Sequence, residues 1–272
     1  MPNADVVDAD RAHALVARCL TQPDFLAVAL EQARNGSSPL VGAAELERIA
    51  LFAGFITKVK HNPLRSVLPC TLHLLALLGD EVAFFTSYVP AYAAHRANGP
   101  LTLDRQVELM SDALRAFIRE RPARIRAAFD DMLRHEATLA RLASHDAANG
   151  DDVGSRASVR WRGRFALERY AFDVASAYGA LQQREFDLAT GLRERDNLLG
   201  YWRPRGSDEV IFFETDELTA LLFGLVDGHR TVADVARVLA ANGLDEIAPA
   251  ELEAFFGEAE ERGFVAVGTP CG

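Results

Sequence analysis

Cysteine and long apolar runs are both scarce in this sequence of 272 residues. The three cysteines, Cys19, Cys70 and Cys271, are too few and too scattered for a disulfide framework or a thiolate zinc site. There is no uninterrupted run of about 18 apolar residues, so we expect no membrane span. The acidic start lacks the basic and apolar regions of a secretion signal, and we therefore expect a cytoplasmic protein.

The motifs by which many enzymes are recognised are also missing, among them GxGxxG, HExxH, GxSxG and CxxC. The seven histidines form no close run of metal ligands, and adjacent residues such as His135 and Glu136 point to different sides of a helix. Cys70 lies in an apolar segment, where a buried structural role is commoner than a nucleophile. We therefore expect no catalytic residue, metal ligand or cofactor in this chain. The alternative of a stand-alone thiol or metal enzyme requires tightly bound metal in the purified chain.

The composition is that of a folded protein, with 49% apolar and 25% charged residues, but charge is unevenly distributed. Residues 206–272 carry three basic and 14 acidic side chains, a net charge of −11, whereas residues 1–205 carry 26 basic and 25 acidic. Between residues 156 and 205, ten arginines stand against six acidic residues. Because an acidic region repels phosphate groups, we expect no nucleic-acid partner.

Residues 9–143 have the pattern of successive helices with short connections and no fixed-period repeat. Proline- and glycine-containing breaks at residues 61–63, 79–80, 98–100 and 121–122 separate them. After one or two short helices, these breaks predict main helices at residues 43–60, 64–78, 81–97, 103–119 and 123–143. Small and polar residues follow, and we predict a helical domain at 1–146 and a linker at 147–164.

Residues 165–272 predict a second, smaller domain. An alternating segment at 165–174 favours a strand, although a helix that continues through residue 181 is a competing interpretation. Residues 199–204 and 209–214 flank a glycine-containing turn, which predicts a hairpin. Thr215, Thr231 and Pro249 are placed to open three helices, and residues 264–267 suit a return strand. The predicted fold class is mainly α with a small α+β module: an N-terminal helical domain and a C-terminal winged-helix-like domain.

The segment 201–267 resembles the peptide-recognition domains of pathways that modify ribosomally made peptides, which are similar to the small pyrroloquinoline-quinone chaperone. A core pattern of this kind is carried by Leu225, Asp227, Gly228, Thr231, Val235 and Leu239. Upstream, residues 51–69, 74–96 and 167–178 resemble accessory subunits of multinuclear non-heme iron-dependent oxidative enzymes, such as the partner protein in 3-thiaglutamate biosynthesis.

This resemblance implies a non-catalytic partner protein that binds a precursor peptide's leader and presents it to an iron-dependent oxidative enzyme, which would itself hold the iron. In such domains the leader adds as an extra strand beside the hairpin. The groove would here lie between residues 209–214 and 250–262. The implied peptide contacts are Val210, Ile211, Phe212, Phe213, Leu252, Phe255, Phe256 and Ala259, and the same helix stripe would also suit the domain's own core.

A DNA-binding transcription regulator, with a winged-helix tail and a helical sensor domain, is the alternative. A DNA reader needs a basic recognition helix, whereas residues 250–262 carry five glutamates and one arginine. The arginines of the predicted linker, Arg156, Arg160, Arg162 and Arg164, keep that alternative open; they could equally hold an acidic leader, contact the enzyme or remain solvated.

Overall fold

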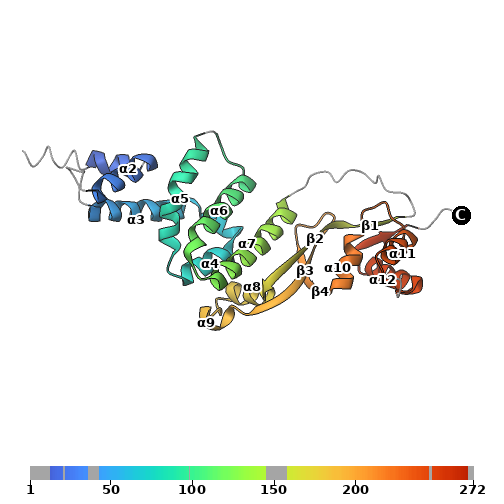
Figure 1. Ribbon diagram of the computed structural model, residues 1–272. Coiled ribbons are helices and arrows are strands. Elements are labelled where there is room, and N and C mark those ends of the chain that lie inside the picture. Colours follow the sequence, from blue (N-terminus) through green and yellow to red (C-terminus); the bar gives the residue numbers. More distant parts are fainter. Residues whose placement is uncertain are drawn as a thin grey trace, which may run out of the picture. The chain divides into compact units, whose positions relative to one another are not determined.

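The computed structural model describes residues 13–20, 22–35, 43–97, 99–144, 158–244 and 247–268. A mainly helical N-terminal region precedes a small C-terminal α+β region with short antiparallel sheets (Figure 1). The described residues form two compact units. The first extends to Leu133 and includes Tyr178–Gly191, and the second consists of Arg134–Ala177 and the residues from Leu192 onward.

The units divide at different points from the predicted domains. The boundary falls inside helix α7 (Ala123–Ser144), because the second half of α7 packs with the C-terminal sheet. Residues 178–191, at the end of α8 (Val174–Gln183) and in α9 (Leu188–Gly191), belong to the helical unit. Of the predicted linker, residues 147–157 lie outside the described residues, whereas residues 159–161 and 163–164 lie in strands.

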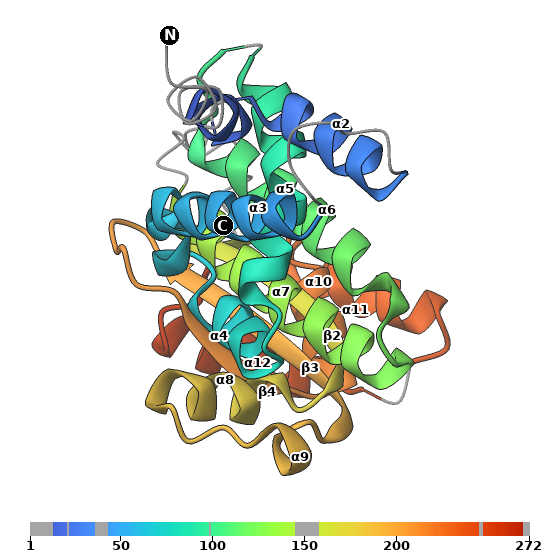
Figure 2. The ribbon, with the colours of Figure 1, turned by 90° about the vertical axis from the view of Figure 1, so that its left-hand side faces the viewer.

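The helical unit follows the predicted breaks closely. Residues 13–20 are helical, and the elements after them are α2 (Pro23–Arg34), α3 (Ala43–Lys60), η1 (Asn62–Ser66), α4 (Pro69–Leu77), α5 (Glu81–Arg96), α6 (Leu103–Phe117) and η2 (Ile118–Glu120). The helix predicted at 64–78 is interrupted, because Pro69 forces the residue before it out of the helical region and opens α4. Helix α3 lies beside α2 and α5 (Figure 2).

The C-terminal unit is built on a three-stranded antiparallel sheet with the order β2–β3–β4. Its strands are β2 (Gly163–Phe172), β3 (Glu194–Pro204) and β4 (Ile211–Thr215). The predicted hairpin is confirmed: Trp202 pairs with Ile211 and Gly200 with Phe213 across it. Gly206 has a φ of +78° in the connection, a conformation that glycine adopts without strain. Strand β4 is an edge strand, and no other described strand pairs with its outer side.

Three helices and a short second sheet complete this unit. The helices are α10 (Glu217–Gly224), α11 (Val232–Ala241) and α12 (Pro249–Glu261), and β1 (Val159–Trp161) pairs with β5 (Val265–Val267). Thr231 caps α11 with Asp234 in a capping box, as predicted. The cap of α10 is Asp216 rather than Thr215, which is the last residue of β4. The core of this region includes Val159, Leu222, Val235, Leu239, Leu252, Phe256 and Val265.

One face of the three-stranded sheet packs against the second half of α7. His135 Nδ1 lies 2.6 Å from Tyr201 Oη, which lies 2.8 Å from Tyr170 Oη, and all three side chains are buried. The Arg203 guanidinium, also buried, donates to the carbonyl oxygen of Leu142 at 2.9 Å. The sheet therefore has an inner face against α7 and an opposite face toward α10 and α12.

Candidate functional site

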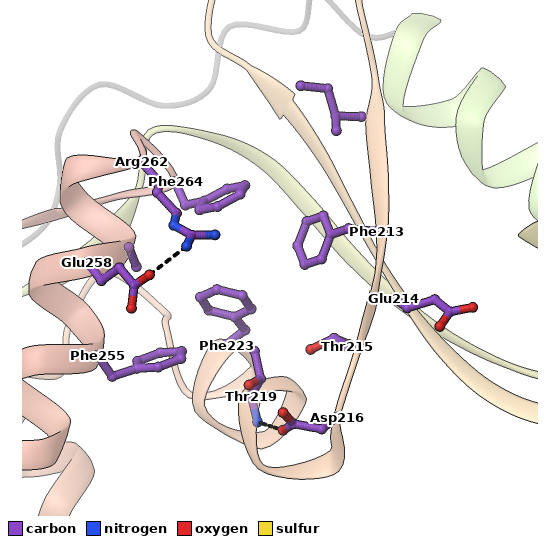
Figure 3. Close-up of a pocket in the computed structure, with 12 residues that line it drawn as sticks. Phe213, Glu214, Thr215, Asp216, Thr219, Phe223, Phe255, Glu258, Arg262 and Phe264 are labelled. Atoms are coloured by element: carbon purple, nitrogen blue, oxygen red, sulfur yellow. Dashed lines mark hydrogen bonds and ion pairs between the residues drawn. The ribbon is translucent and has the colours of Figure 1, made fainter.

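A cavity of about 780 Å³ lies in the C-terminal unit between β4, α10 and α12. Residues from both segments between which the resemblance implied a groove, 209–214 and 250–262, contribute to its lining. Side chains from the three elements converge on it, together with Phe264, which follows α12 (Figure 3). Its lining consists of Ile211, Phe213, Glu214, Thr215, Asp216, Thr219, Phe223, Phe255, Glu258, Ala259, Arg262 and Phe264.

Four phenylalanine rings form the apolar walls. Phe223 is buried, with an exposed fraction of 5%, and its ring centroid lies 5.3 Å from that of Phe255 and 6.1 Å from that of Phe264. Phe213 projects from β4, with its centroid 5.5 Å from that of Phe264. Phe213, Phe255 and Phe264 are half-buried, so a bound molecule would complete the burial of rings that the chain leaves partly exposed.

Strand β4 presents alternate side chains to the cavity and to α7. Ile211 and Phe213 line the cavity. Phe212 points to the other face, where its ring centroid lies 4.9 Å from that of His135. Because β4 is an edge strand beside this cavity, the geometry suits an added strand whose own alternate side chains enter the apolar space.

The rim of the cavity carries charged side chains in defined pairs. On α12, the Arg262 guanidinium donates to Glu258 Oε1 at 2.6 Å. The backbone N–H of Thr219 donates to Asp216 Oδ1 at 2.7 Å, and this bond holds the pKa of Asp216 below its ordinary value. Glu214 points away from the cavity (Figure 3) and accepts two hydrogen bonds from Arg195, at 2.9 and 2.8 Å.

Half of the predicted peptide contacts line the cavity, and the other half lie elsewhere in the unit. Ile211, Phe213, Phe255 and Ala259 line the cavity, whereas Leu252 and Phe256 are buried in the core with exposed fractions of 1% and 0%. Phe212 packs on the opposite face, and Val210 precedes β4, outside the lining. The helix stripe on α12 thus supplies both the core and the cavity wall, since one face of a helix is wide enough to reach both.

Sequence reasoning missed several lining residues, chiefly Asp216, Thr219 and Phe223 of the α10 region and Phe264 after α12. The two phenylalanines lie in segments that the sequence predicts as helix and strand. Their convergence depends on how α10 packs against α12, and the pattern along the chain does not contain that information. Strand periodicity could have separated Phe212 from Phe213, because neighbouring side chains in a strand point to opposite faces.

Arg162, one of the arginines of the predicted linker, is bound by other parts of the C-terminal unit. The Arg162 guanidinium lies 3.2 Å from Glu260 Oε1, and its backbone N–H donates to the carbonyl oxygen of Phe264. The Trp161 ring between these arginines stacks on Phe165, with centroids 4.0 Å apart. Arg156 lies outside the described residues.

Three observations bear on the other classes of function. Within the described ranges, no cluster of three or more histidine, cysteine or acidic side chains could hold a metal ion. Helices long and apolar enough to cross a membrane are likewise not found in that part of the chain. No protein-family model matches the sequence, and no curated protein shows significant similarity to it.

Proposed function

We propose that this chain is a non-catalytic partner protein that binds the leader of a ribosomally made precursor peptide and presents it to an iron-dependent oxidative enzyme. The observation that supports this function is the cavity of about 780 Å³ beside the outer edge of β4. An exposed strand edge is a liability that proteins usually cover. One that borders an apolar groove suits the capture of an extended peptide.

The C-terminal unit acts as a winged-helix-like peptide-recognition domain in this proposal. The hairpin β3–β4, the helices α10, α11 and α12, and β5 follow each other in the order that the resemblance requires. Backbone hydrogen bonds along β4 supply affinity that depends little on sequence, and the phenylalanine-lined cavity selects side chains. Holding the leader raises the effective concentration of the peptide's reactive end at the enzyme, which supplies the iron and the chemistry.

Random peptides displayed on phage, selected on the full chain, test the binding function. A selected peptide should slow amide hydrogen exchange in residues 211–215, because strand addition ties up backbone groups on β4. Selection that enriches no peptide, or a bound peptide that leaves exchange in β4 unchanged, would contradict the proposal. Random duplex DNA serves as the comparison ligand, and a salt-sensitive gel shift would favour the DNA-binding alternative.

The partner enzyme is tested separately. The proposal expects a multinuclear iron-dependent oxidative enzyme to be encoded near this gene. Such an enzyme, purified and mixed with the chain, should form a stoichiometric complex by size-exclusion chromatography with light scattering. Two separate peaks at all mixing ratios would contradict this part of the proposal, whatever the outcome of peptide selection.

A further inference from the structure

The charges around the cavity are predominantly negative. Among the described lining residues, Asp216 and Glu258 are acidic and Arg262 is the single basic one. Glu214 also belongs to the lining, but its carboxylate points away from the cavity and pairs with Arg195. Arg262 is already engaged by Glu258 at 2.6 Å. Both side chains are well exposed, at 67% and 62%, so this pair is held loosely and an incoming charged group can replace either partner.

The segment of the sequence that supplies the whole lining has the same sign. Residues 206–272 carry 14 acidic and three basic side chains. On α12 the exposed glutamates include Glu251, Glu253 and Glu261, none of which lines the cavity. A field of this sign accelerates the approach of cationic segments and disfavours acidic ones.

The shape of the site suits a long basic side chain. Lysine and arginine pack their apolar stems against hydrophobic surface and keep the charged end at the rim. Here the stem would lie against Phe213, Phe255 and Phe264, whose ring faces also attract cations. The charged end would reach the carboxylates of Glu258 and Asp216, both of which line the cavity.

We infer that the cavity selects a cationic segment, an extended peptide in which lysine or arginine alternates with apolar residues. This inference rests on the proposed function and adds the chemical class of the peptide to it. Within the site, Glu258 acts as an attractive contact for the peptide's basic residue, and Arg262 competes with that residue for the same carboxylate.

Substitutions of Glu258 and of Arg262 test whether the cavity prefers a basic or an acidic peptide. Glu258→Gln should weaken binding of a selected cationic peptide about two- to fivefold, the size expected of one exposed charge pair. Arg262→Gln should strengthen binding by a similar factor, because it frees Glu258. Glu253→Gln is the charge-matched control: Glu253 is exposed on α12 but does not line the cavity, so a smaller effect is expected.

Peptides selected from the random library should be enriched in lysine and arginine, and their affinities, measured by fluorescence anisotropy, should fall as salt rises. Enrichment of aspartate and glutamate, or opposite effects of the two rim variants, would overturn the inference and leave the proposed function standing. Selected peptides with no charge bias and no response to either variant would also overturn it. If no peptide is enriched, the proposed function fails and the inference fails with it.

Discussion

The ring of Phe213 lies over Gly200, its partner across the β3–β4 pair. A methyl group built at Gly200 would come within 2.8 Å of two ring carbons of Phe213, closer than such contacts allow. The Phe213 ring can occupy this position only because Gly200 has no side chain. Glycine within a strand commonly marks such a close approach, and here it shapes one wall of the cavity.

Gly200→Ala should move the Phe213 ring and weaken peptide binding by about three- to tenfold, since overpacking displaces side chains at the contact. Titration of a selected peptide by fluorescence anisotropy measures the effect. The matched control is Gly257→Ala in α12, where, apart from its chain neighbours and the nearby backbone of the same helix, nothing lies within 4 Å of the added methyl group. Equal effects of the two substitutions would show that Phe213 does not depend on Gly200.

Neighbouring positions of β4 should respond differently to the same substitution. Ile211→Asp removes an apolar lining side chain that is 43% exposed, so it should weaken peptide binding with a small change in stability, because the lost apolar contact outweighs the attraction of one more exposed carboxylate. Phe212→Asp places a carboxylate against His135 and Tyr201 and should destabilise the C-terminal unit by about 2–4 kcal/mol. Urea unfolding and peptide titration on both variants provide the comparison. If Ile211→Asp lowered stability and Phe212→Asp weakened binding instead, the two side chains would lie on the opposite faces of β4 from those described here.

Much of the fold follows from local signals that the sequence contains. The turn around Gly206, the capping box of Thr231 with Asp234, and Pro249 at the start of α12 act over a few residues, and each is confirmed. The boundary between the two units, in contrast, depends on a contact between residues far apart in the sequence. It depends on His135 meeting Tyr201, residues 66 apart in the chain, and periodicity cannot identify such a partner.

Burial within the helices was also harder to predict than the helices themselves. The apolar residues of α3 are spaced as a helix requires, yet Phe52, Phe55 and Val59 are 52%, 49% and 57% exposed. Spacing shows which residues share a face, but only the packing of α2 and α5 determines which face is covered. The same limit separates Phe255, which lines the cavity, from Phe256, which lies in the core.

Glu81 connects three elements of the helical unit. Its carboxylate lies 2.6 Å from Lys58 Nζ of α3 and also pairs with Arg65 of η1, and its side chain is only 10% exposed. Glu81→Gln should lower the free energy of unfolding by about 1–3 kcal/mol, because two partly desolvated cations lose their partner.

Thermal unfolding followed by far-ultraviolet circular dichroism measures the effect of Glu81→Gln. The matched control is Glu47→Gln, which removes an exposed pair with Arg34 and should change stability by less than about 0.5 kcal/mol. If Glu47→Gln lowered the free energy of unfolding by the same amount, the burial of Glu81 would not add to the strength of its ion pairs.

The stability of the C-terminal unit should decrease in acid because of His135. Burial lowers the pKa of His135 to about 4, from an ordinary value of 6.5. The unfolded chain binds a proton below pH 6.5 that the folded chain does not bind until about pH 4. The stabilisation is therefore complete above pH 6.5 and is lost as the pH falls toward 4, by roughly 3 kcal/mol in total.

Both tryptophans of the sequence, Trp161 and Trp202, lie in this unit, so urea unfolding followed by tryptophan fluorescence reports on it selectively. His135→Gln should flatten the dependence of unfolding free energy on pH between 6.5 and 4, whatever it does to stability at pH 8. Tyr170→Phe removes a hydroxyl group 2.8 Å from Tyr201 Oη but leaves His135 in place, so it should keep the wild-type slope. A slope that survives His135→Gln unchanged would assign the acid sensitivity to other groups.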